Sequence, residues 1–181
     1  MPHAELVGPF PEGADPVAYD QQRRRLLWSL PSGLYLLSSR AGEERNLMAV
    51  SLVSQLATDP KLLGVAVERE AATAALIRGG GAFGLAVLAR GERDAVRHFV
   101  KPAAHDPAAR TLAGTPYTDA PVTGLPVPAL AGAFLDCRVT AEHDLGSHLL
   151  FVGEVVDALV SDEKALVEPL RMEDTRMSYG G

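Results

Sequence analysis

The sequence predicts a mainly β protein: a small antiparallel barrel with a few short helices. Apolar runs of strand length fill most of the chain, and short turn-forming segments separate them. The helical segments are few and are not placed regularly as crossovers, which argues against a doubly wound parallel sheet. With 181 residues, of which 47% are hydrophobic, the chain can bury a core as a single domain over residues 1–181.

The N-terminal elements are an arm and a helix. Residues 1–14 contain three prolines and two glycines without periodicity, which predicts a flexible arm. Asp15 can cap a helix and Pro16 suits its first position, so we expect a helix over residues 15–29, before Pro31. We expect this helix to cover an open end of the barrel.

Strands and short helices alternate through the middle of the chain. Turn-forming segments bound four strand-length runs, residues 33–39, 46–57, 62–68 and 82–89. Two short helices are expected, residues 71–78, which the glycines at 79–81 end, and residues 92–100. The first three strands are expected to pair antiparallel because only short turns join them.

The second half of the chain begins with a proline-rich segment. Residues 102–128 hold 6 of the 13 prolines, so we expect a long surface loop beside a binding site. Two long strands follow, residues 133–142 and 148–160. The turn-forming sequence 143–146 between them predicts a closing hairpin.

Charge and cysteine content narrow the functional class. The chain has 17 Lys and Arg against 23 Asp and Glu, a net charge of −6, which argues against nucleic-acid binding. No apolar run approaches the roughly 18 residues that a membrane span needs. The single Cys137 permits no intramolecular disulfide and suits a reducing compartment. We therefore expect a soluble, cytoplasmic protein.

Several motifs are better explained by structure than by chemistry. Residues 79–84 match G-x-G-x-x-G, but the dinucleotide fingerprint needs a strand before it and a helix after it, and here the order is reversed. No two of the five histidines have the close helical spacing of a metal site, so no metal is expected. Cys137 lies in a strand-like run and is interpreted as a small core residue.

Two features suggest a ligand site. His148 begins the last strand directly after a turn, where it can lean over the barrel mouth and donate a hydrogen bond; the alternative is a solvated histidine at a strand end. Residues 46–60 mix small, hydroxyl and apolar side chains. Such a strand leaves backbone donors and acceptors open to a flat heteroaromatic ring, although an ordinary barrel strand has the same pattern.

Seven segments together carry a resemblance to a known family. They are residues 30–35, 46–60, 73–78, 83–88, 136–138, 146–155 and 179–181. Residues 146–155 read GSHLLFVGEV, and the chain ends in YGG. In this order and spacing, from about residue 20 to residue 181, the chain resembles the flavin reductase-like family of the FMN-binding split barrel.

The resemblance implies a fold, an activity and a site. The family fold is a six-stranded antiparallel Greek-key barrel that dimerises with flavin across the interface, and its usual activity is flavin reduction by NADH or NADPH. The cofactor implied is FMN, with FAD as the alternative. The residues implied to line the flavin ring and ribityl chain, or to lie nearby, are Asn46, Met48, Ala49, Val50, Ser51, Ser54 and Ala57. Arg69 and Thr73 are implied for the flavin phosphate, and His148 as the catalytic residue that positions the nicotinamide.

The chain departs from the family pattern at several positions. Ala49 and Ala57 stand where the family often has Thr and Ser, Lys61 replaces a second proline, and Ser147 replaces Asp. Two hydroxyl contacts to flavin are lost, each worth about 1 kcal/mol, so flavin binding is expected to weaken modestly. Glu68 and Glu70 beside Arg69 would repel a phosphate unless they point outward.

The expected function is therefore NAD(P)H-dependent reduction of FMN or FAD by a homodimer, with reduced flavin available to a monooxygenase. Two alternatives stay open. One is a binding protein for FMN, a deazaflavin or a planar tetrapyrrole without nicotinamide turnover. The other is a flavoenzyme with its own substrate, which the segment 102–128 could serve.

Overall fold

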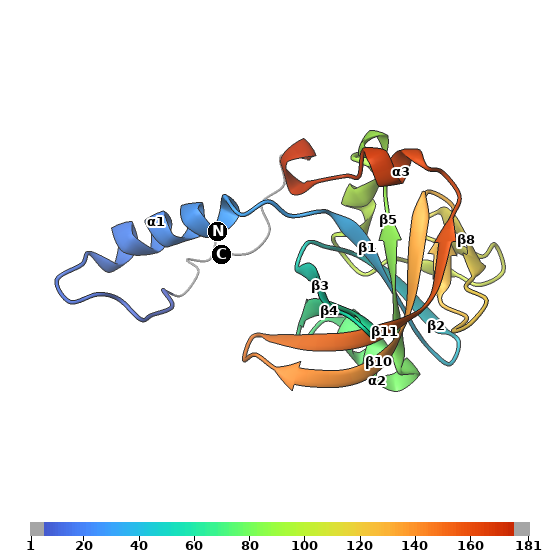
Figure 1. The fold of residues 1–181 in the computed structure, drawn as a ribbon, viewed down its shortest axis with the longest axis horizontal. Helices are drawn as coiled ribbons and strands as arrows, with labels where there is room; N and C mark the ends of the chain where they lie inside the picture. The colour runs from blue at the N-terminus through green and yellow to red at the C-terminus, as the bar shows by residue number, and fades with distance from the viewer. Residues whose placement is uncertain (1–5, 176–181) are drawn as a thin grey trace.

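The computed structural model describes residues 6–175 and has a mainly β architecture (Figure 1). Seven antiparallel strands form one sheet in the order β2-β1-β5-β10-β11-β4-β3. They are β1 (Tyr35–Ala41), β2 (Glu44–Val50), β3 (Val53–Thr58), β4 (Lys61–Glu68), β5 (Ala82–Val87), β10 (Ala133–Asp144) and β11 (His148–Val160). A four-stranded sheet consists of β6 (His105–Asp106), β7 (Thr111–Leu112), β8 (Thr115–Asp119) and β9 (Pro126–Pro128).

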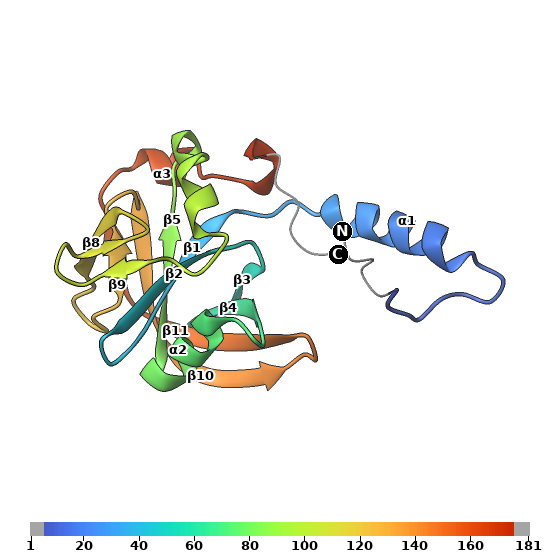
Figure 2. The same ribbon diagram turned by 180° about the vertical axis from the view of Figure 1, so that it is seen from behind.

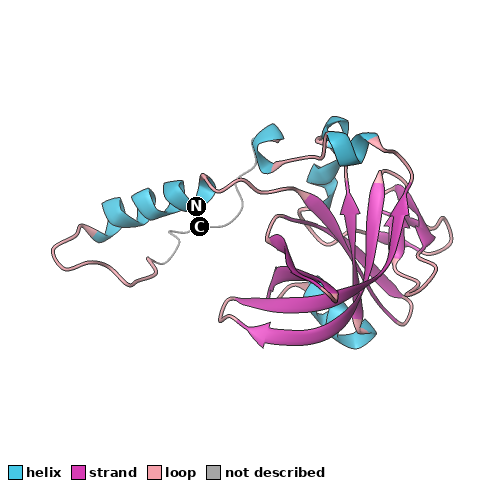
Figure 3. Ribbon diagram, in the orientation of Figure 1, coloured by secondary structure: helices cyan, strands magenta, loops and turns pink. Residues whose placement is uncertain are grey.

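Apart from α1, the helices are short and lie around the larger sheet (Figure 3). They are α1 (Pro16–Trp28), α2 (Ala72–Gly80), α3 (Lys164–Val167) and the 3₁₀ turns η1 (Arg90–Glu92), η2 (Ala95–Phe99) and η3 (Met172–Asp174). The predicted α2 is confirmed, and Gly81 ends it with a left-handed φ of 67°. The helix predicted over 92–100 is instead the two turns η1 and η2. No helix in residues 6–175 is long and apolar enough to cross a bilayer.

The two edges of the larger sheet come from one stretch of chain. A single strand was expected over 46–57, and this prediction is wrong: β2 ends at Val50 and β3 begins at Val53. The break occurs because the chain changes partner there. Val50 pairs with Tyr35 of β1, whereas Val53 pairs with Val65 of β4. The strand count is accordingly seven in this sheet, not the six expected.

Both faces of the larger sheet are buried at its strands β1 and β5. Successive residues Leu36 and Leu37 of β1 are fully buried but belong to separate clusters, as alternation along a strand requires. The cluster around Leu37 includes Phe83 of β5 and Ile77 of α2. Cys137 belongs to it, and burial raises the pKa of its thiol to about 12, so the prediction of an unreactive core cysteine is confirmed.

The other cluster explains the proline-rich segment. Residues 102–128 were expected to be a long loop, but they contain all four strands of the small sheet. Leu112 and Tyr117 of its strands, and Leu125 just before β9, are buried in the same cluster as Leu36 of the larger sheet. A hydrogen bond also joins the two sheets: the Ser38 hydroxyl donates to the carbonyl oxygen of Pro126 at 2.6 Å. The segment is therefore a folded layer over the core, although many of its residues are exposed.

Helix α1 leaves the body of the molecule. Its predicted limits are confirmed, and the Val17 amide donates to the capping carboxylate of Asp15 at 3.0 Å. The expectation that it covers a barrel end is wrong, because α1 projects away from the sheets in both views (Figures 1 and 2). Only Asp20 of its 13 residues is buried. Residues 6–14 fold back along it, with the Phe10 ring edge-on to Tyr19.

Candidate functional site

A cleft of about 1130 Å³ lies where the root of α1, the end of β2 and the start of β11 meet. Its walls come from four parts of the chain, residues 27–35, 48–52, 66–68 and 169–173, with Val100 and His148. Leu52, Leu30 and Trp28 are each about half exposed or more, so the cleft presents an apolar wall to solvent. A concave, largely apolar site of this size suits a planar organic cofactor.

The end of β2 forms one wall of the cleft. Met48, Ala49, Val50 and Ser51, all predicted to line a flavin, line it. Because β2 is an edge strand, half of its backbone N–H and C=O groups point away from β1. The small side chains of Ala49 and Ser51 leave this backbone accessible. These backbone N–H and C=O groups fit the pyrimidine edge of a flavin, which alternates hydrogen-bond donors and acceptors.

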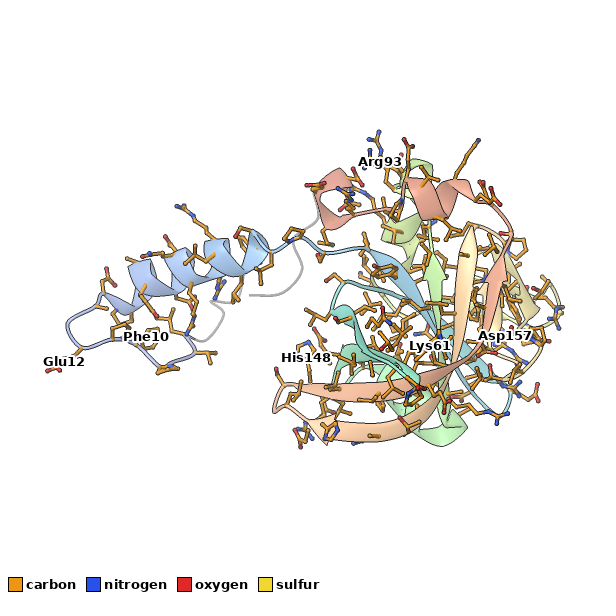
Figure 4. The ribbon with its side chains drawn as sticks, viewed as in Figure 1. Phe10, Glu12, Lys61, Arg93, His148 and Asp157 are labelled. Atoms are coloured by element: carbon orange, nitrogen blue, oxygen red, sulfur yellow. The ribbon has the colours of Figure 1, made fainter. Side chains whose placement is uncertain are left out.

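His148 lies at the start of β11, beside β4, and lines the cleft as predicted (Figure 4). Its Nδ1 is 2.9 Å from the Ser147 hydroxyl. When that hydroxyl donates to Nδ1, the neutral ring carries its proton on Nε2 and can donate a hydrogen bond from there. In the β4–β11 register His148 lies opposite Glu68, which also lines the cleft.

Asn46 and Thr73 lie behind the cleft wall, not in it. Both are buried, and the Asn46 Nδ2 donates to the Thr73 hydroxyl at 2.8 Å. The Asn46 Oδ1 accepts from the Ala103 amide at 2.9 Å, and the Thr73 hydroxyl lies 3.5 Å from the Met48 sulfur. The pair therefore supports Met48 from inside the protein.

The remaining predicted residues also lie outside the cleft lining. Ser54 and Ala57 are on β3, and the Ser54 hydroxyl donates to the Gln55 carbonyl oxygen at 3.2 Å. The Arg69 guanidinium donates to the Gly146 carbonyl oxygen in the β10–β11 turn, at 2.7 Å from Nη2. The segment 179–181, which carries part of the resemblance, lies outside the described residues.

Sequence reasoning missed two walls of the cleft. One is the segment 29–33, where a Cβ on Gly33 would lie 2.2 Å from the Tyr35 hydroxyl, so any larger residue there would displace the Tyr35 ring. The other is residues 169–173, which an isolated β-bridge between Gly33 and Arg171 brings to the site. The glycine before an aromatic residue was a usable local signal, but the bridge joins residues far apart in the chain.

A mainly β body with an apolar cleft at the end of an edge strand defines a small-molecule-binding β protein. The family model described as "Flavin reductase like domain" matches residues 27–180. The chain belongs to the flavin reductase-like family.

Relatives and solved structures agree with this assignment. Diflavin flavoprotein A 1 of Synechocystis is 28% identical over 81% of this chain and 25% of its own length, so the chain spans about a quarter of that relative. The reductase component of 4-hydroxyphenylacetate 3-monooxygenase from Thermus thermophilus is 29% identical over 73% of this chain and 79% of that protein. The NADH:FAD oxidoreductase of Streptomyces globisporus C-1027 has a similar structure, with a TM-score of 0.67, 26% identity and coverage of 86% and 85% of the two chains.

Proposed function

We propose that this protein is an NAD(P)H:flavin oxidoreductase that moves hydride from nicotinamide to FMN or FAD. The main observation behind this proposal is that residues 48–51, at and just after the end of β2, line the same cleft as His148 of β11. The similarity to an NADH:FAD oxidoreductase over most of both chains supports the same activity. When bound, the flavin supplies the hydride-accepting chemistry itself.

The chain's own residues bind and orient the two rings. Backbone groups at the end of β2 would hold the pyrimidine edge of the flavin, and Met48 would contact its ring system. His148 would donate a hydrogen bond from Nε2 to the nicotinamide and so position it against the flavin. The apolar residues Trp28 and Leu52 exclude water, which favours close ring contact.

We also propose that the active form is a homodimer with the cleft at its interface. Leu26 in α1 and Leu30 just after it are 62% and 65% exposed, and Leu52 just before β3 and Leu56 within it are each 49% exposed. A second copy would cover this apolar surface.

Reduced flavin from this enzyme would serve a monooxygenase, as with the reductase component from Thermus thermophilus. In this arrangement the flavin leaves the cleft after reduction.

The test uses Trp28, the single tryptophan of the chain, which lines the cleft. Titration with FMN and with FAD should quench its fluorescence, and addition of NADH or NADPH should then give steady oxidation of the nicotinamide. Quenching without oxidation would move the conclusion to a flavin-binding protein. Absence of quenching would contradict the proposed site.

A further inference from the structure

We propose that Arg171 binds the phosphate group of the flavin or nicotinamide cofactor at the C-terminal wall of the cleft. The proposal rests on the proposed function and adds to it the anion-binding residue of the site. Phosphate is the shared chemistry of both cofactors, and the experiment below distinguishes which of them Arg171 contacts.

The charged residues that line the cleft include one candidate for binding a phosphate. Among the cleft-lining residues, the ionisable side chains besides His148 and Tyr35 are Glu68, Arg171 and Glu173. FMN, FAD and NAD(P)H all bring negative phosphates, which two carboxylates would repel. Among residues 6–175, Arg171 is the single Lys or Arg in this lining, so it is the described side chain that can form charge-assisted hydrogen bonds to a phosphate there.

Backbone contacts hold Arg171 at the cleft. The Leu34 amide donates to the Leu170 carbonyl oxygen at 3.0 Å, and the Met172 amide donates to the Ser32 carbonyl oxygen at 3.2 Å. The Arg171 amide donates to the Asp174 carboxylate at 3.0 Å. The Cα of Arg171 is therefore fixed on both sides, so the side chain starts from a defined point on the wall.

The guanidinium itself is available. The side chain of Arg171 is 54% exposed, and its ion pair with Glu173 is 3.4 Å long, with Glu173 72% exposed. A long ion pair between exposed groups contributes little to stability, so exchanging Glu173 for a phosphate costs little. A fixed backbone with a movable guanidinium is suited to capturing an anion.

The two residues that the family resemblance implies for the phosphate have other partners. Arg69 donates to Gly146 in the hairpin turn, and the buried Thr73 hydroxyl accepts from Asn46. Neither lines the cleft. A phosphate in the cleft therefore meets Arg171 rather than these side chains.

The experiment compares Arg171→Met with Arg90→Met. Arg90 is a matched control: it is 46% exposed and pairs with Asp174 at 3.3 Å in the same C-terminal segment, but it does not line the cleft. The full-length variants are titrated with riboflavin, FMN and FAD, using Trp28 quenching, and KM and kcat are measured for NADH and for reduced nicotinamide mononucleotide. Arg171→Lys tests partial rescue.

Contact with the flavin phosphate predicts that Arg171→Met weakens FMN binding by about tenfold and leaves riboflavin within twofold of wild type. Contact with the nicotinamide phosphates predicts unchanged FMN binding, with KM for NADH about tenfold higher and kcat within twofold. In either case Arg90→Met behaves as wild type, and the effect shrinks as salt is added.

Two results would overturn the proposal. One is a variant whose FMN and FAD affinities and KM for NADH all stay within twofold of wild type. The other is riboflavin weakened as much as FMN, which would indicate a distorted cleft. If the proposed function itself is wrong, the wild-type protein will not bind flavin or will not oxidise the nicotinamide. That result would overturn both the proposed function and the role of Arg171.

Discussion

The Arg69 guanidinium donates two hydrogen bonds to the carbonyl oxygen of Gly146, with Nε at 3.0 Å and Nη2 at 2.7 Å. It also pairs with Asp144, whose carboxylate accepts from the Gly146 amide at 2.8 Å. The Arg69 amide donates to the Ser147 carbonyl oxygen at 3.0 Å. These contacts join the end of β4 to the turn that directly precedes His148.

Arg69 is therefore expected to position His148. Arg69→Met should loosen the turn and lower the rate of flavin reduction at saturating NADH by about tenfold, with the Kd for FMN within twofold of wild type. Stopped-flow reduction and FMN titration measure the two quantities. Lysine at position 69 should restore part of the rate.

The matched control is Arg78→Gln. Arg78 pairs with Glu142 of the same hairpin, away from the turn, so its loss should leave the reduction rate near wild type. A large loss of FMN affinity in Arg69→Met, with riboflavin unaffected, would instead support the phosphate role that the family resemblance implies for Arg69.

Asp144 should make the turn sensitive to acid. The Gly146 amide and the Arg69 guanidinium lower the pKa of its carboxyl. A lowered folded-state pKa means that the stabilisation is present above the ordinary value of about 4 and is lost as pH falls through the folded pKa. The protection factors of the amides at residues 145–148, that is, their exchange rates relative to free amides at the same pH, should therefore be high at pH 7 and fall below about pH 4. Asp144→Asn should have low protection factors at both pH values; equal protection in variant and wild type at pH 7 would argue against this role.

Asp136 should shift stability in the opposite direction. Burial raises the pKa of this carboxyl, against the effect of hydrogen bonds from Thr123, whose hydroxyl donates at 2.6 Å. A raised folded-state pKa means that the contribution of Asp136 to stability increases as pH falls toward the ordinary value. Thr123→Val should lower the free energy of unfolding at pH 7 by about 1–3 kcal/mol, because the buried carboxylate loses a donor.

Urea unfolding at pH 7 and at acid pH measures this effect. The cost of Thr123→Val should be smaller at acid pH, where Asp136 is protonated. A cost that does not change with pH would mean that the hydroxyl acts only through packing.

His148 should affect reduction rather than flavin binding. His148→Ala removes the Nε2 donor and should slow reduction of bound FMN by NADH by about tenfold, with the Kd for FMN close to wild type. Stopped-flow reduction and Trp28 quenching separate the two effects. Reduction kinetics equal to those of the wild type would exclude the positioning role.

Helix α1 offers a direct test of the dimer. Leu26→Glu places a charge on an apolar side chain that is 62% exposed in the single chain, and it should shift the protein toward monomer in analytical ultracentrifugation. FMN affinity should fall with it. Gln21→Glu, at an exposed polar position of the same helix, is the control and should stay dimeric. A wild-type protein that sediments as a monomer would contradict the dimer.

Local patterns predicted much of the fold. The Asp15 cap, the Gly81 stop and the alternation in the long hairpin each depend on neighbours in sequence, so their signals were sufficient. The break at Ser51 was missed because the small and apolar run is continuous across it, and the change of strand partner is a tertiary event. The short strands of residues 105–128 were missed because prolines dominate that segment and two-residue strands have no period.

The site residues divide in the same way, into those predictable from local sequence and those placed by distant contacts. Met48 to Val50 and His148 lie on regular strands, Ser51 follows directly after β2, and the structure brings them together as expected. The phosphate role of Arg69 stays a prediction: the start of a helix beside an arginine resembles an anion site, while in the structure the guanidinium contacts the hairpin turn. Arg171 could not be predicted from its sequence neighbours, because its β-bridge to the distant Gly33 brings it to the cleft.

The central claim is that this cleft stacks nicotinamide on flavin. The most direct measurement is anaerobic mixing of the FMN-loaded protein with NADH, and separately with NADPH, while the oxidised-flavin absorbance band is followed. We predict rapid bleaching, much faster than that of free FMN under the same conditions. A band from bound FMN that stays unbleached with both nicotinamides would contradict the claim.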